Sequence, residues 1–228
     1  MSAYAAMLLA DARLPTGGHA YSAGVEPALR AGLAPDRVRE YMIGRALTTS
    51  RTEAGTAVVA RSALAGGSSS GLSPGNGLDD VLAAWAARTP SPALREAAVA
   101  QGRGYLRFAR SLWPGAPELE ELTAVTRPLC RPVVLGAVAV LAAMSPADLV
   151  RLVIYDDAAT AAAALLKLEP RDPAEVSGWV LDACAAAEPS VAELAALTDP
   201  GAIPASGAPQ TEEWAQAHAV MNQRLFRA

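Results

Sequence analysis

Alanine-rich runs are the feature of this sequence that most restricts its fold. One of them, AATAAAALLKL, covers residues 158–168, and similar runs recur along the chain. Alanine is the best helix former because it loses no side-chain entropy when the backbone coils. Aromatic residues make up only 5% of the chain, and clusters of β-branched or aromatic residues with alternating polarity are almost absent. The sequence therefore predicts an all-α fold.

The organisation along the chain predicts one domain, a bundle of about ten helices over residues 1–228. The length of 228 residues is sufficient to bury a large core, and no internal repeat is apparent. The polar stretch SSSGLSPGNG predicts a flexible loop near 66–77, and residues 211–228 read as an amphipathic helix or tail. The predicted helices span 3–11, 22–30, 35–65, 79–88, 92–112, 117–126, 132–144, 146–168, 173–187 and 190–197.

Charge and hydropathy argue against two classes of partner. The formal net charge is -4 and the pI is near 5.3, so there is no overall attraction to nucleic acid. The longest uncharged run, from Pro132 to Ala147, is shorter than the roughly 20 residues that span a bilayer. The first residues lack the basic region and apolar run of a signal peptide. Cys130 and Cys184 are far apart and read as free thiols, so we expect a soluble, cytoplasmic protein without membrane contact.

Several kinds of catalytic or binding motif are missing. Lys167 is the only lysine and Leu168 follows it, which excludes the Lys-Ser/Thr of a phosphate-binding P-loop. The two histidines, His19 and His218, stand alone, so no metal site is predicted. The segment GSSSG (67–71) matches the G-x-S-x-G nucleophile motif in letters, but it lies in the loop between helices and not at a strand-to-helix turn. A helix-turn-helix regulator is a weaker reading, because no compact three-helix pattern surrounds the arginines of residues 39–55.

Two pairs of neighbouring aspartates leave one enzymatic alternative open. Asp79-Asp80 and Asp156-Asp157 could hold magnesium for a diphosphate substrate, as paired carboxylates do in helical terpenoid enzymes. Asp79-Asp80 also fits a helix N-terminus, where anions complement the helix dipole. Asp156-Asp157 is predicted in the middle of a helix, without a third carboxylate one turn away. The alternative function is thus an all-α, magnesium-dependent enzyme.

The segment RLPTGGHAYSAGVE (13–26) is the most distinctive in the chain. Its pattern, Leu-Pro-x-Gly-Gly-x-x-x-Ser-x-Gly-x-Glu near the N-terminus, resembles the signature of the UreF family of urease accessory proteins. The alanine-rich helix that carries Lys167 before Leu-x-Pro and the C-terminal MNQRLFRA also resemble that family. The chain departs from the family pattern at 169–172, which reads Glu-Pro-Arg-Asp, and at 127–136, which lacks a histidine.

The resemblance implies an assembly protein that is not an enzyme. It implies a chaperone for nickel insertion that bridges a UreD/UreH-type accessory protein, the nickel-carrying GTPase UreG and apo-urease. Nickel would be handled by the complex, with no cofactor bound stably to this chain. Apolar helix faces are also compatible with a homodimer.

Residue roles follow from chemistry and from the resemblance together. Pro15, Gly17, Gly18 and Gly24 are expected to fix the loop conformation, since proline restricts φ and glycine allows positive φ. Ser22 is predicted to cap the helix 22–30, with Glu26 in its first turn. Lys167 fits either a cation at a helix C-terminus or a charge that a partner reads. The predicted partner-binding residues are His19, Tyr21, Ser22, Glu26, Lys167, Arg224, Phe226 and Arg227.

Overall fold

Helices account for nearly all of the regular structure. A computed structural model of the chain describes residues 2–11, 13–66, 76–221 and 225–226. Those residues contain no β-strand, which confirms the predicted all-α class. Short 3-10 turns lie at Gly18–Ala20, Pro35–Arg37, Glu188–Ser190 and Pro200–Ala202. The α-helices are α1 (Ser2–Leu9), α2 (Val25–Arg30), α3 (Val38–Leu47), α4 (Thr49–Ala65), α5 (Asn76–Arg88), α6 (Pro92–Leu112), α7 (Pro117–Glu121), α8 (Arg131–Leu141), α9 (Pro146–Leu168), α10 (Pro173–Ala187), α11 (Val191–Ala195) and α12 (Pro209–Ala219).

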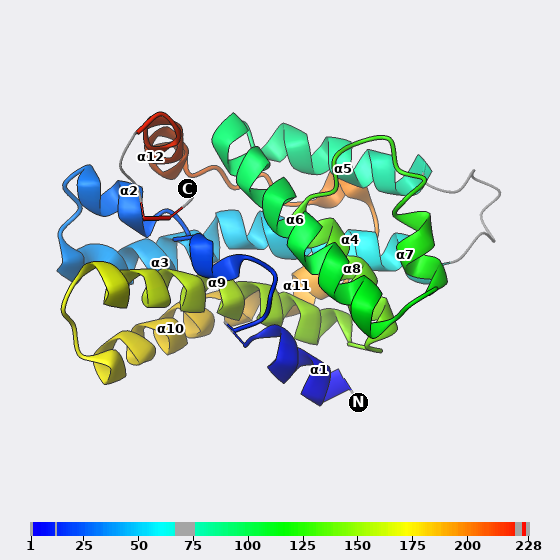
Figure 1. The fold of residues 1–228 in the computed structure, drawn as a ribbon, viewed down its shortest axis with the longest axis horizontal. Coiled ribbons are helices and arrows are strands. Elements are labelled where there is room, and N and C mark those ends of the chain that lie inside the picture. The colour runs from blue at the N-terminus through cyan, green and yellow to red at the C-terminus, as the bar shows by residue number, and fades with distance from the viewer. Residues whose placement is uncertain (1, 12, 67–75, 222–224, 227–228) are drawn as a thin grey trace.

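Helices α4, α8 and α9 form the centre of the bundle. α4 packs against both α8 and α9, while α10 packs against α3 and α9. α6 lies over α8, and α5 lies beside α4 (Figure 1). α12 packs on α2 and α6, so the end of the chain returns to the N-terminal loop (Figure 1). This return brings together three segments that are far apart in the sequence.

The core is one continuous cluster of apolar side chains that extends from Leu9 to Phe226. α8 is its most enclosed element, because every residue from Arg131 to Ala139 is buried. α4 approaches α8 closely at Gly136, where a Cβ atom would lie 2.7 Å from the carbonyl oxygen of Ala57. Small residues therefore allow the close helix packing that the alanine content suggests.

Helix ends marked by a proline and a capping side chain were predicted correctly. α6, α9 and α10 have the predicted bounds of 92–112, 146–168 and 173–187. The Ser145 hydroxyl accepts a hydrogen bond from the backbone N–H of Asp148 at 3.1 Å, as expected for the N-cap of α9. Ser91 and Asp172 cap α6 and α10 in the same way. At these helix ends, the local signal of a proline next to a capping side chain suffices to determine the helix bounds.

The predicted long helix 35–65 is wrong, because the chain breaks at Thr48. There φ is -126° and ψ is -92°, which separates α3 from α4. The Thr48 hydroxyl donates to the carbonyl oxygen of Gly44 at 2.7 Å and so competes with helix continuation. The helix predicted from residue 22 also starts later, at Val25, because Ala23 and Gly24 have positive φ. Most of the predicted 66–77 loop, with the 67–71 motif, lies outside the described residues.

Candidate partner-binding site

The loop 13–26 is held in one conformation by its own backbone and by two neighbouring helices. Gly17 and Gly24 have positive φ values of 86° and 78°, which a side chain would strain, whereas Gly18 belongs to the 3-10 turn. The Tyr41 hydroxyl of α3 donates to the Ala23 carbonyl oxygen at 2.9 Å. Pro15 is exposed at the outer bend. The loop is therefore an ordered part of the fold.

Two glycines of α6 allow two other segments, the 13–26 loop and the segment before α8, to pack closely against this helix. A Cβ atom at Gly104 would overlap the backbone carbonyl of Thr16, so only glycine allows this approach. At Gly102 a Cβ atom would lie 2.5 Å from the carbonyl oxygen of Leu129, in the segment before α8. The sequence G-x-G at 102–104 is thus a packing motif.

Ser22 does not cap α2, which corrects the prediction. Gly24 is the N-cap residue and makes no side-chain capping bond. The Ser22 side chain is fully buried instead, and its hydroxyl oxygen has no hydrogen-bond partner within the described part of the chain. The positive φ values at Ala23 and Gly24 turn the chain after Ser22, so its side chain points away from the first turn of α2.

Glu26 joins the N-terminal loop to the end of the chain. Only 1% of its surface is exposed. Its carboxylate accepts hydrogen bonds from the backbone N–H groups of Leu225 at 2.9 Å and Phe226 at 2.8 Å. The Arg30 guanidinium donates to it at 2.9 Å, and Nε2 of His218 on α12 lies 3.2 Å from it. Burial alone would raise the pKa of Glu26, but these donors outweigh burial and lower it.

A pocket of about 200 Å³ brings four of the predicted residues together. His19 and Tyr21 of the loop, Lys167 at the end of α9, and Phe226 all line it. Nζ of Lys167 lies 5.3 Å from the centre of the Phe226 ring, a cation–π contact. His19 and Lys167 are exposed, Tyr21 is half-buried, and Phe226 is buried. Burial raises the pKa of Tyr21 to about 12, so its hydroxyl stays protonated at neutral pH.

The predicted residues thus divide into three groups. His19, Tyr21 and Lys167 line one pocket and are exposed or half-buried; Phe226 lines the same pocket but is buried, and Ser22 and Glu26 are buried and do not line it. Arg224 and Arg227 lie outside the described residues. Their roles in partner binding stay predictions.

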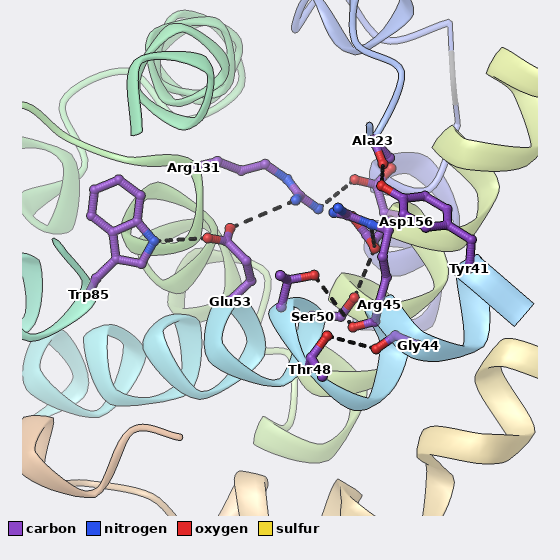
Figure 2. Close-up of polar contacts among 12 residues, drawn as sticks. Ala23, Tyr41, Gly44, Arg45, Thr48, Ser50, Glu53, Trp85, Arg131 and Asp156 are labelled. Carbon is purple, nitrogen blue, oxygen red and sulfur yellow. Dashed lines mark hydrogen bonds and ion pairs between the residues drawn. The ribbon is translucent and has the colours of Figure 1, made fainter. Parts of the chain in front are cut away.

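A buried network of ion pairs forms the inner wall of this pocket. Arg45 of α3 donates to the Asp157 carboxylate at 2.6 Å and 2.9 Å, and the Ser50 hydroxyl donates to it at 2.8 Å. Arg131 donates to Asp156 at 2.6 Å (Figure 2). Although burial opposes it, the charge of Arg45 lowers the pKa of Asp157, whereas burial raises that of Asp156.

Glu53 and Trp85 extend the network toward α5. Figure 2 shows the Glu53 carboxylate between the Trp85 indole and Arg131. Trp85 Nε1 donates to Glu53 at 2.9 Å, and the Arg131 guanidinium lies 4.0 Å from it. The sequence reading missed Arg45, Glu53 and Arg131 as a unit, because their partners lie on other helices. The available signal was the position of Arg131 and Asp156-Asp157 inside apolar segments, where a buried charge needs a partner.

Three of the four paired aspartates, Asp79, Asp156 and Asp157, are engaged in structural contacts, and Asp80 is exposed. Asp156 and Asp157 each bind an arginine, as described above. Asp79, in the first turn of α5, accepts hydrogen bonds from the hydroxyl and the backbone N–H of Thr126. Within the described residues no group of three or more His, Cys, Asp or Glu side chains is placed to hold a metal ion. Cys130 and Cys184 are free thiols, and burial raises the pKa of each.

Across the described residues, none of the helices has the length and apolar character needed to cross a bilayer. This agrees with the short uncharged run in the sequence.

Comparison with known proteins agrees with the resemblance. The UreF family model matches residues 34–184. A urease accessory protein UreF from Mycobacterium sp. (strain JLS) is 36% identical over 200 residues, which is 85% of this chain and 88% of the relative. One from Mycolicibacterium vanbaalenii is 38% identical over 205 residues, 88% of this chain and 91% of the relative. The UreF from Mycobacterium tuberculosis (strain ATCC 25177 / H37Ra) is 36% identical over 208 residues, with the same coverage of 88% and 91%. The chain belongs to the UreF family of urease accessory proteins.

Proposed function

We propose that this protein is a chaperone for urease maturation and has no catalytic activity of its own. It bridges a UreD/UreH-type accessory protein, the nickel-carrying GTPase UreG and apo-urease in the cytoplasm while nickel is inserted. Family membership supports the coarse role. The bridging role and the choice of partners are the parts that need a test.

One observation carries the proposal. The loop, the end of α9 and the C-terminal segment come together at the His19–Tyr21–Lys167–Phe226 pocket. Exposed rings with polar tips and one isolated cation provide contact area together with polar contacts that select a partner. Glu26 beneath the pocket fixes Leu225 and Phe226, so the loop and the chain end are presented as one rigid surface.

Nickel is proposed to be carried by the partners and not by a site on this chain. The carboxylates next to the pocket, Asp156 and Asp157, are neutralised by Arg131 and Arg45. The same pairing leaves the magnesium-enzyme alternative without an observation in its favour. Titration of the isolated protein with Ni²⁺ is expected to show no stoichiometric binding.

The test is complex formation measured by size-exclusion chromatography. The full chain is mixed with each accessory protein of its own host, alone and together. The wild type is compared with His19→Ala/Tyr21→Ala, with Lys167→Ala, and with a chain that ends before Arg224. Lys167→Arg, which keeps the cation, and Arg151→Ala, at an exposed position sixteen residues earlier on α9, are the matched controls.

A co-eluting complex that the pocket variants weaken and the controls retain is the expected result. Absence of any complex from folded wild-type protein would refute the chaperone role. A complex that all variants form equally would move the partner surface elsewhere. The elution volume of the protein alone reports whether it is a homodimer.

A further inference from the structure

Four exposed arginines stand out because they have no ion-pair partner among the residues that the structure describes. They are Arg103, Arg107 and Arg110 on α6 and Arg127 in the connection between α7 and α8. In the described part of the chain, every other arginine side chain contacts a carboxylate or donates to a backbone carbonyl. For example, Arg39 pairs with Asp182 at 2.7 Å, and Arg88 donates to Ile203 at 2.6 Å. We call the four the α6 arginine face.

The arrangement of this face is unfavourable for the isolated protein. Arg103, Arg107 and Arg110 are separated by four and three residues, so they lie along one side of the helix and repel one another. Like charges at this spacing destabilise a helix. The nearest acid in the helix, Glu96, lies seven residues before Arg103 and lines one of the hollows described below. Among the described residues, neither Glu96 nor the α7 acids, Glu118, Glu120 and Glu121, form an ion pair with the face. An external carboxylate would relieve this repulsion.

The face borders two hollows that share Arg103. One, between α5 and α6, has a volume of about 610 Å³, an apolar floor that includes Leu82, Trp85 and Val99, and Arg127 on its wall. The other has a volume of about 340 Å³ and is lined by the 13–26 loop through Thr16, Gly17 and Tyr21, with Arg107 beside it. α6 lies across the near side of the molecule in Figure 1, and the loop is seated on it at Gly104.

We propose that the α6 arginine face docks an acidic, amphipathic segment of a partner protein. Its carboxylates would pair with the guanidinium groups, which form two parallel hydrogen bonds to one carboxylate. Its apolar side chains would fill the hollow floored by Leu82, Trp85 and Val99. Arginine is also enriched in protein interfaces. The apolar lining of the hollow beside the arginines favours a protein segment with apolar side chains over a nucleic-acid backbone as the ligand. This proposal rests on the proposed role in assembly and names a second surface for it, beside the pocket.

The test compares the affinities of full-length variants for the accessory proteins of the same host. The triple variant Arg103→Gln/Arg107→Gln/Arg110→Gln removes three charges from the face and leaves the His19–Lys167 pocket intact. Arg37→Gln/Arg39→Gln/Arg151→Gln is its control, since it removes three charges from exposed arginines elsewhere. Binding is measured by biolayer interferometry at 50 and 300 mM NaCl, with folding checked by circular dichroism. We expect the face variant to bind at least one partner tenfold more weakly with a shallower salt dependence, and the control to stay within twofold.

A second variant separates lost contacts from lost folding. Val99→Glu places a carboxylate one turn before Arg103, at the i, i+4 spacing that favours an internal ion pair. The new side chain should occupy Arg103 and weaken partner binding more than Val99→Gln does, without lowering the melting temperature below that of Val99→Gln.

The remaining outcomes decide against the proposal in different ways. If the wild type forms a complex and the face variants bind it equally, the docking surface is refuted and the proposed function stands. If the wild type binds no accessory protein, both fail. If a 20-nucleotide single-stranded DNA binds the wild type and binds the face variant more weakly, the face binds phosphate groups, and the acidic-protein proposal is overturned.

Discussion

Glu26 is a buried carboxylate whose two oxygens contact groups from two helices and from the end of the chain. Arg30 contacts it from α2, His218 from α12, and the amides of Leu225 and Phe226 from the C-terminal segment. Hydrogen bonds to charged groups contribute more than neutral ones. We therefore predict that Glu26→Gln lowers the free energy of unfolding by about 2 kcal/mol, measured by urea denaturation. Glu40→Gln, which breaks an exposed pair with Arg37, should cost less than about 1 kcal/mol. Equal losses of unfolding free energy in the two variants would contradict the role of Glu26 in anchoring the end of the chain.

The lowered pKa of Glu26 gives this contribution a pH dependence. Because the pKa in the folded state lies below its ordinary value of 4.5, the carboxylate stabilises the fold at all pH values above 4.5. That stabilisation is lost as the pH falls through the folded-state pKa. The gap in unfolding free energy between wild type and Glu26→Gln should thus shrink as the pH falls below 4.5. A gap as wide at pH 3 as at pH 5 would contradict the assignment.

The Arg45–Asp157 pair is the residue-scale link between α3 and α9. Both side chains are buried, and each would be left as an uncompensated charge without the other. Asp157→Asn should therefore lower the free energy of unfolding by about 3–5 kcal/mol, whereas replacing both partners by apolar residues should cost much less. Thermal unfolding of Asp157→Asn, Arg45→Met and Arg45→Met/Asp157→Leu tests this. Asp182→Asn, which breaks a half-exposed pair, is the control. A double variant as unstable as the single ones would mean that the network is needed as a whole.

At the scale of elements, α6 supports both the loop and the arginine face. Gly104→Ala should push the loop off its seat, because the added methyl group would overlap Thr16. We expect a loss of about 1–3 kcal/mol in the free energy of unfolding and weaker partner binding. Gly178→Ala on α10 is the matched control, since a Cβ atom there meets nothing within 4 Å. That substitution should stabilise the helix by about 0.5–1 kcal/mol. Two variants that change stability in the same direction would contradict this packing role.

The elements also show what a sequence reading can and cannot predict here. α9 and α10 were predicted to the residue because Ser145-Pro146 and Asp172-Pro173 are local stop and start signals. The break at Thr48 was missed, because the apolar pattern continues through it and the cause is a hydroxyl bond to Gly44. The sequence predicts the motif residues of the candidate site, and their role in partner binding stays a prediction, whereas the anchoring of Phe226 on Glu26 joins positions 200 residues apart and leaves no local pattern.

At the scale of the whole molecule, the end of the chain completes the core. Phe226 belongs to the same apolar cluster as Leu9 and is only 6% exposed. A chain that ends at Val220 should therefore be less stable by about 2 kcal/mol or more, from the lost burial of Phe226 and the loss of the two backbone hydrogen bonds that Leu225 and Phe226 donate to Glu26. Calorimetry should show one cooperative transition for both chains, shifted down in the shorter one. Phe226→Ala in the full chain should reproduce most of the shift. An unchanged transition in the shorter chain would remove the C-terminal segment from the core.

The one lysine of the chain gives chemists a ready-made reporter. Lys167 stands at the rim of the pocket with its ammonium over the Phe226 ring, and arginine provides every other basic side chain apart from the two histidines. Besides the α-amino group at the N-terminus, an amine-directed fluorophore or biotin ester will thus mark one side chain, at the place where the loop meets the chain end. The rate at which Lys167 is acylated, followed by mass spectrometry, will report whether Phe226 stays against the ammonium group and whether a bound partner covers it. No engineered cysteine is needed.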